Sequence, residues 1–138
     1  LQVIRPDVYI IEKFGLSETA LIRSLPEETV SVVFNTPRYI NETQEILVAL
    51  KEKKTKVIGV SDSILSPITP FSDVFFQIPV KFVTFFDTNA AFMAFIHSIV
   101  FALQLKYKKT TKDNLDEYSS FTSRHNFYVK EFLDYVDI

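Results

Sequence analysis

Two polar segments of the chain carry the side chains best suited to chemistry, and each directly follows an apolar run. The first is the loop Asn35-Thr36-Pro37-Arg38-Tyr39-Ile40-Asn41-Glu42, which lies between a predicted strand and the start of a predicted helix. The unpaired N–H groups and the dipole of a helix start favour an anion, and the Arg38 guanidinium could hold a phosphate or carboxylate with two donors. The alternative is that Asn35 and Thr36 satisfy the backbone of a turn while Arg38 lies on the surface.

The second segment is Ser61-Asp62-Ser63, which offers hydroxyls and one carboxylate at the end of the next predicted strand. Asp62 could orient a sugar hydroxyl or act as a base. An aspartate in this position also commonly caps a helix or a turn, and that interpretation stays open. Ligands of open α/β sheets bind beyond the carboxyl ends of the strands, where the strand order reverses, so both segments are candidate ligand loops.

Catalytic and metal chemistry have few candidates in this sequence. Glu42, His97 and His125 are the groups that we can place as a base. His97 has no His, Asp or Glu three or four residues after it, so it lacks a helical metal pair and is expected to be a core or interface histidine. His125 is expected at the start of a C-terminal helix. We expect no metal, no cofactor and no catalytic residue.

Composition excludes several classes of site. The 138-residue chain has a net charge of -2, which offers a nucleic-acid backbone no broad positive field. It contains no cysteine, which excludes disulfides, thiolate catalysis and cysteine-ligated metals. Its two glycines, Gly15 and Gly59, cannot build a glycine-rich phosphate loop of the P-loop or dinucleotide type.

The elements that position the candidate loops alternate between strands and helices. Apolar runs predict buried strands at 29–34, 56–60 and 73–78, and weaker runs predict short strands at 2–4 and 8–11. Apolar periodicity and end signals predict helices at 17–24, 41–53, 88–106 and 126–136, with Ser17 as an N-cap, Asn41 and Gln44 as a capping box, and 110–116 as a loop. This pattern indicates an α/β fold, a three-layer αβα sandwich with a mostly parallel sheet.

The stretch from Ala90 to Leu103 is the most apolar part of the chain. It is shorter than the ~20 residues that a bilayer needs, so we expect a buried helix, no membrane partner and a cytoplasmic location. Aromatic side chains point nearly all round this helix. Phe85, Phe86 and Phe101 therefore need a further cover, which predicts a symmetric homodimer.

The order of these motifs resembles the SIS (sugar isomerase) domain over about Leu25 to Leu105. The resemblance is carried by the strand at 29–34, the helix that starts with Asn41-Glu42, and the block Thr55-Lys56-Val57-Ile58-Gly59-Val60-Ser61-Asp62-Ser63-Ile64-Leu65-Ser66-Pro67-Ile68, followed by Phe71-Ser72-Asp73-Val74-Phe75. The helix with Asn89-Ala90-Ala91 is most similar to the SIS domains that end RpiR-type bacterial transcriptional regulators. The resemblance implies a flavodoxin-like topology.

In that family a separate N-terminal helix-turn-helix domain binds DNA, and the SIS domain senses a phosphosugar as a dimer or higher oligomer. The resemblance therefore implies a non-catalytic domain that binds a sugar phosphate or similar anion through Asn35, Thr36, Arg38, Asn41, Glu42, Ser61, Asp62 and Ser63. The chain starts at Leu1 and is expected to be a single SIS-like domain over 1–138, the C-terminal part of a longer protein. Two alternatives stay open: a degenerate SIS scaffold without a ligand, and a sugar-phosphate isomerase.

The first candidate loop departs from the family pattern, which reads Ser-x-Ser-Gly-x-Thr-x-Glu. Aligned without gaps from Asn35, this chain keeps only Glu42 of the named positions, and Arg38 occupies the glycine position. A cradle of hydroxyls and amides is thereby replaced by a loop with a stiff proline, Pro37, and a bulky cation. The sequence predicts an altered ligand loop.

Overall fold

The computed structural model describes residues 5, 7–80 and 90–125 of the chain. It divides into two compact units, one formed by Ile10–Phe95 and the other by Leu1–Tyr9 together with Ile96–Ile138. Both candidate loops belong to the first unit. The expectation of one SIS-like domain over the whole chain stays a prediction.

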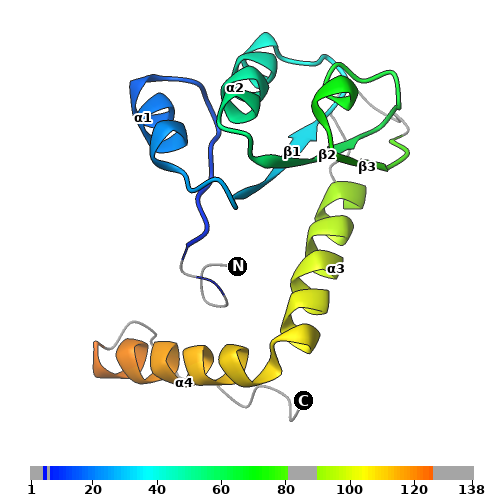
Figure 1. Ribbon diagram of the computed structural model, residues 1–138. Coiled ribbons are helices and arrows are strands. Elements are labelled where there is room, and N and C mark those ends of the chain that lie inside the picture. The colour runs from blue at the N-terminus through cyan, green and yellow to red at the C-terminus, as the bar shows by residue number, and fades with distance from the viewer. Residues whose placement is uncertain (1–4, 6, 81–89, 126–138) are drawn as a thin grey trace. The chain divides into compact units, whose positions relative to one another are not determined.

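The described residues form helices and strands in alternation (Figure 1), as the sequence predicts. The elements are α1 (Leu16–Ser24), β1 (Val30–Asn35), α2 (Asn41–Glu52), β2 (Lys56–Ser61), the short 3-10 helix η1 (Thr69–Phe71), β3 (Val74–Gln77), α3 (Ala90–Lys106) and α4 (Lys108–Arg124). The predictions of strands at 29–34, 56–60 and 73–78 and of a helix at 41–53 are confirmed within one residue at each end.

The strands form one parallel sheet in the order β1-β2-β3. Val30 pairs with Lys56 at one end of the β1–β2 ladder, and Asn35 pairs with Ser61 at the other. Ser61 in turn pairs with Gln77 of β3. The predicted α/β class with a parallel sheet is confirmed, whereas the described strands run in sequential order and contain no reversal.

One face of the sheet packs against α1 and α2, which lie on the same side of it in Figure 1. The core on this face consists of Ile22, Leu25, Leu47, Leu50, Val57 and Ile68, with Val33 and Phe75 packed against it. Leu47 and Val57 are completely buried. Burying one such side chain stabilises a fold by roughly 1.5–3 kcal/mol, so this layer supplies much of the unit's stability.

The opposite face of the sheet is apolar too, and its side chains come from the alternate residues of each strand. Val30, Val32, Phe34, Val74 and Phe76 remain between 37% and 54% exposed. Phe92, in the first turn of α3, makes an edge-to-face contact with Phe34 at a ring distance of 6.2 Å. Helical residues of this unit therefore contact both faces of the sheet. On the second face Val60 of the central strand is completely buried, whereas the side chains of β1 and β3 remain partly exposed.

Both predicted helix caps are wrong. Gly15, rather than Ser17, is the N-cap of α1, so the helix has no side-chain cap at this end. The N-cap of α2 is Ile40, and neither Asn41 nor Gln44 forms the predicted capping box, since no side-chain cap is present. The observed N-cap lies two residues before Ser17 in α1 and one residue before Asn41 in α2.

Two further predictions differ from the structure, and others fall on residues that the structure does not describe. Residues 8–11 form no strand, and residues 110–116 are part of α4 rather than a loop. The stretch from Lys108 to Arg124 contains no glycine or proline, and Lys109–Asp113 and Lys112–Asp116 have helical i,i+4 spacing, which favours a helix despite the polar composition. The predictions for 2–4 and 126–136, and for Phe85 and Phe86, lie outside the described residues.

No single helix among the described residues is long and apolar enough to span a membrane. By length and composition alone, α3 and α4 together could do so as a pair bent by 103°.

Candidate functional site

The carboxyl ends of β1 and β2 bring the two candidate loops together. Asn35 and Ser61 are paired in the sheet register and are 5% and 0% exposed. The Ser61 hydroxyl donates a hydrogen bond to the Asn35 carbonyl oxygen at 2.6 Å. The parallel register thus places a polar side chain at the end of each strand on the core-facing side of the sheet.

Asp62 is the acceptor that joins the two loops. Its Oδ1 accepts a hydrogen bond from the Tyr39 hydroxyl at 2.9 Å and lies 3.2 Å from the Ser61 hydroxyl. Gln77, at the end of β3, donates from Nε2 to the Asp62 carbonyl oxygen at 3.2 Å. The Asp62 carboxylate therefore bonds to Tyr39 and Ser61 instead of capping a helix or a turn, which was the alternative interpretation of this residue.

The environment of Tyr39 raises the pKa of its phenol above the usual value. Burial is the largest cause, and the hydrogen bond to Asp62 is the next. The Ser61 and Ser66 hydroxyls act in the opposite direction and lower this pKa. The phenol is neutral at physiological pH and sits among two serine hydroxyls and a carboxylate.

Arg38 is exposed and has a left-handed backbone conformation, with φ of 78°. A side chain disfavours this region of backbone space, which glycine occupies without penalty. Arg38 stands at the position where the SIS pattern has glycine. The loop therefore retains a backbone turn suited to glycine while carrying a cation.

The remaining predicted ligand residues divide into turn formers and helix-start residues. The Ser63 hydroxyl accepts a hydrogen bond from the Leu65 backbone N–H at 3.2 Å, so it stabilises its own turn. Thr36 is half-buried in the loop after β1. Asn41 and Glu42 are exposed in the first turn of α2, where Glu42 complements the helix dipole.

Two buried polar atoms near this cluster have no hydrogen-bond partner among the described residues, namely Asn35 Nδ2 and Ser66 Oγ. Ser66 is 2% exposed. Its hydroxyl lies close enough to Tyr39 to lower the pKa of the phenol, although it does not make a hydrogen bond of good geometry. A buried donor without a partner costs about 1–3 kcal/mol, so the cluster has unused hydrogen-bonding capacity.

Tyr39, Ser66 and Gln77 belong to this cluster but were not predicted as site residues. Tyr39 and Ser66 lie within the quoted motifs, and Gln77 is the last residue of β3. The parallel register would have identified Gln77, because the carboxyl ends of neighbouring parallel strands meet at one edge. The link from Tyr39 to Asp62 spans 23 residues of sequence and depends on side-chain direction, which composition does not reveal.

The two histidines lie on α3 and at the end of α4. His97 is exposed on α3, so the core interpretation is wrong and the interface interpretation stays a prediction. His125 is the C-cap of α4, and its ring lies 4.5 Å from that of Phe121. The helix that it was expected to start lies outside the described residues. Both histidines belong to the unit that does not hold the candidate loops. Across residues 5, 7–80 and 90–125, no three His, Cys, Asp or Glu residues could together hold a metal ion.

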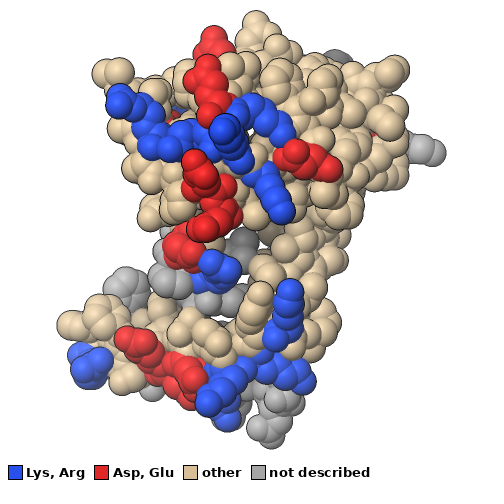
Figure 2. Space-filling model, in the orientation of Figure 1, with Lys and Arg blue, Asp and Glu red and all other residues tan. Residues whose placement is uncertain are grey.

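Charge on the surface is mixed. Figure 2 shows basic and acidic side chains intermingled on the face that it draws. This agrees with the net charge of -2 and leaves that face without a broad basic field.

Comparison with known proteins identifies the fold but gives no sequence relative. No family model and no curated protein matches the chain. Its structure is similar to that of the sugar isomerase domain of an RpiR transcription factor from Sphaerobacter thermophilus, with a TM-score of 0.80. The match has 15% sequence identity and covers 87% of this chain and 67% of that one. The resemblance to the SIS domain is thereby confirmed at the level of the fold.

Proposed function

We propose that the chain is an SIS-type regulatory domain that binds a small sugar-derived anion where the loops after β1 and β2 meet. The observation that carries this proposal is the convergence of Asn35, Ser61 and Asp62 at the carboxyl edge of an SIS-like sheet. Open α/β sheets bind ligands beyond the carboxyl ends of their strands, and these side chains lie at such ends although the order of the described strands does not reverse. The structural similarity to the sugar isomerase domain of a transcription factor supports a regulatory role.

Each predicted residue has a role in this proposal. Arg38 and the start of α2, at Asn41 and Glu42, attract the anionic group of the ligand, because a guanidinium and a helix N-terminus both favour negative charge. Asp62 accepts a hydrogen bond from a sugar hydroxyl. Further polar contacts come from Asn35, Thr36, Ser61 and Ser63.

A non-catalytic role fits the surroundings of the candidate bases. Sugar-phosphate isomerisation needs a positioned base close to a polarised carbonyl. Glu42 is exposed on the first turn of α2, and His97 and His125 belong to the other unit. The comparison with a transcription factor domain also favours sensing over catalysis.

The proposal includes association with a second copy of the chain. Met93, Phe101 and Leu105 of α3 are 49%, 56% and 45% exposed. Apolar side chains exposed along one helix require a cover. A homodimer or higher oligomer would supply it, with DNA contacted only by a separate N-terminal domain in a cytoplasmic regulator. Sedimentation of the ligand-free chain tests this part, and a monomer at every concentration would contradict it.

Isothermal titration calorimetry tests the ligand. The panel contains glucose 6-phosphate, fructose 6-phosphate, sorbitol 6-phosphate and inorganic phosphate, titrated into the wild type, Arg38→Gln and Lys54→Gln. Lys54 is a matched control, since it is also exposed and also has a positive φ, of 58°. We expect Arg38→Gln to lose roughly tenfold in affinity for a sugar phosphate, and Lys54→Gln to bind as the wild type does.

A ligand-free interaction scaffold is the second candidate, and one observation favours it. The Asp62 carboxylate and the Ser61 hydroxyl already have hydrogen-bond partners within the chain, at Tyr39 and Asn35. A scaffold would form the same oligomer with or without the panel compounds and would show no heat of binding with any of them.

A further inference from the structure

Tyr39 reaches from one candidate loop into the other. Its hydroxyl donates to Asp62 across 23 residues of sequence, in a part-buried hydrogen bond of 2.9 Å. The Ser61 and Ser66 hydroxyls are its other polar neighbours, since both alter its pKa. A phenol hydroxyl among a carboxylate and two serine hydroxyls has the surroundings that a protein typically gives to a bound sugar hydroxyl.

The cluster around this phenol is not saturated. Asn35 Nδ2 and Ser66 Oγ are buried and have no hydrogen-bond partner among the described residues. Asn35 is 5% exposed and Ser66 is 2% exposed. A buried donor without an acceptor is unfavourable. A molecule with several hydroxyls could satisfy these groups together with Asp62, which a single phenol hydroxyl does not do.

Backbone strain lies next to Tyr39 in the sequence. Arg38 has φ of 78°, a conformation that is unfavourable for a residue with a side chain. The loop that carries Tyr39 therefore contains an unfavourable backbone conformation at the preceding residue, Arg38.

We propose that Tyr39 is an internal competitor of the ligand, and that its hydroxyl occupies the position on Asp62 that a ligand hydroxyl takes. This inference rests on the proposed function and narrows it. The ligand is a polyhydroxylated compound that donates to Asp62 and accepts from the Asn35 amide, and its binding displaces Tyr39. The affinity of the site is set in part by the free energy needed to move this side chain.

Affinity measurements on Tyr39 variants test the competition, with the calorimetric panel named above. Tyr39→Ala removes the competitor, and we expect it to bind at least one sugar phosphate about tenfold tighter than the wild type does, the factor for one hydrogen bond to a charged group. Tyr39→Phe keeps the ring and loses the hydroxyl, so its gain is smaller. Inorganic phosphate has no sugar hydroxyl for Asp62, so its affinity stays the same. Tyr9→Ala is the control, since Tyr9 is 62% exposed and belongs to the other unit.

The outcomes separate the two proposals. Equal affinity of wild type and Tyr39→Ala for a sugar phosphate overturns the competition and leaves the proposed function intact. Absence of binding to both chains overturns both proposals. Binding to Tyr39→Ala alone supports the competition and shows that the wild-type site is closed by its own side chain.

Fluorine NMR of the chain labelled with 3-fluorotyrosine follows the displacement directly. Loss of one signal in Tyr39→Phe assigns Tyr39 among the six tyrosines. We expect this signal to move towards the position of an exposed tyrosine when a sugar phosphate saturates the site. If Tyr39→Ala does not fold, this shift and the affinity of Tyr39→Phe decide the question. A Tyr39 signal that stays in place in the saturated protein contradicts the inference.

Discussion

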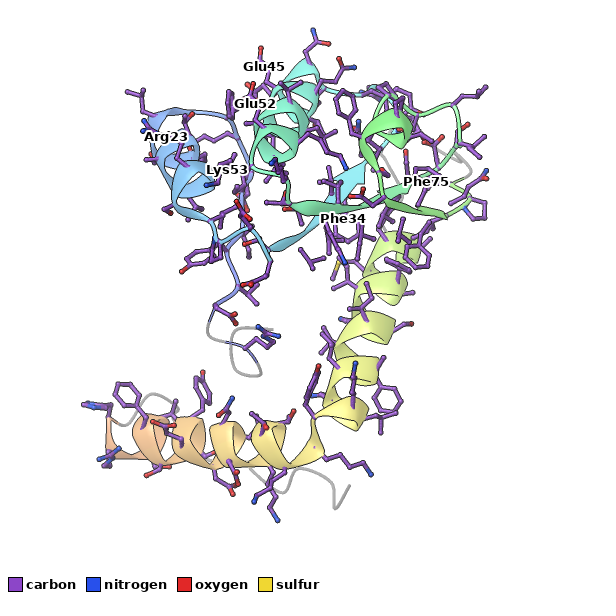
Figure 3. The ribbon with its side chains drawn as sticks, viewed as in Figure 1. Arg23, Phe34, Glu45, Glu52, Lys53 and Phe75 are labelled. Atoms are coloured by element: carbon purple, nitrogen blue, oxygen red, sulfur yellow. The ribbon has the colours of Figure 1, made fainter. Side chains whose placement is uncertain are left out.

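The two faces of the sheet in the unit Ile10–Phe95 have similar chemistry but different surroundings. On one face, Val33, Val57 and Phe75 pack against the helices α1 and α2. On the other face, Phe34, Val74 and Phe76 keep between 37% and 49% of their surface exposed. Phe34 and Phe75, both labelled in Figure 3, lie on these opposite faces because their register partners in β2, Val60 and Gly59, are adjacent residues.

This contrast shows which properties of a sheet can be predicted from an apolar sequence pattern. Unbroken apolar strands predict that both faces are covered, but they do not identify the cover. The face towards α1 and α2 is buried by segments close in sequence. The opposite face meets the start of α3 at Phe92 and Phe95 and remains partly open. A second copy of the chain is the cover that we propose for apolar surface of this kind.

The largest effect is expected from Leu47 in the buried layer. Leu47→Ala leaves a cavity at a completely buried position and should lower the free energy of unfolding by about 2–5 kcal/mol. Val48→Ala is the control on the same helix. Val48 is 47% exposed, so its replacement should change stability by less than about 0.5 kcal/mol. Urea unfolding of both variants measures the difference, and equal losses would show that the two sides of α2 do not differ in packing.

A smaller loss is expected at Gly59, the β2 residue that faces the buried layer. A Cβ at this position would overlap the Ser72 hydroxyl and lie 3.1 Å from Ser72 Cβ and 3.2 Å from a Phe75 ring carbon. Gly59→Ala should therefore destabilise the unit by about 1–3 kcal/mol, the usual cost of overpacking. Thermal unfolding measures the loss. Unchanged stability would mean that the layer between β2 and η1 is loosely packed.

A still smaller effect, dependent on pH, is expected at Asp73. Its carboxylate accepts hydrogen bonds from Lys51 of α2 at 2.8 Å and from the Val57 N–H at 2.7 Å, and these contacts lower its pKa below 3.8. A lowered pKa contributes stability above the unfolded value, and the contribution disappears as the pH falls through the folded value. Asp73 is exposed, so solvent screens the contribution.

The variant Asp73→Asn isolates this contribution. It should melt a few degrees below the wild type at neutral pH, and the gap should close as the pH is lowered beneath 3.8. A gap that is constant from neutral to acidic pH would show that the charge of Asp73 does not hold α2 to the edge of the sheet.

The smallest effect on unfolding is expected on the open face. Val74 is 49% exposed, so Val74→Thr should change the free energy of unfolding of the monomer by less than about 0.5 kcal/mol. If a second copy covers this face, the same variant should weaken association, because a hydroxyl is then buried. Sedimentation at several concentrations distinguishes these effects. A large loss of stability in a strictly monomeric chain would contradict the contrast between the two faces.

Much of the fold could be predicted from sequence because it depends on local pattern. The strands around Val33 and Val57 follow from apolar β-branched runs, and the buried side of α2 follows from the spacing of Leu47 and Leu50. The meeting of the two candidate loops also follows, since parallel strands end at one edge. The caps could not be predicted, because a residue suited to capping performs that role only when the backbone turns at that residue, as Ser17 shows.

The candidate site was predictable in its place but not in its internal contacts. Asn35, Ser61 and Asp62 were expected at the edge of the sheet, and they lie there in contact. The hydrogen bond from Tyr39 depends on the direction of one long side chain in a loop, and the left-handed turn at Arg38 violates the usual preference of its residue type. Both are properties of tertiary geometry that no periodic pattern encodes.

The sequential order of the strands has a consequence for how the chain folds. β2 pairs with β1, which precedes it, and β3 pairs with β2, so each described strand after the first pairs with a strand that has already been synthesised. Pairings between strands that are neighbours in sequence close shorter loops than pairings between distant strands, so their cost in chain entropy is smaller. During synthesis, the segment up to Ser61 can assemble β1, α2 and β2 as it leaves the ribosome, and β3 then adds to an existing edge. The sheet should therefore grow in the direction of translation, one strand at a time.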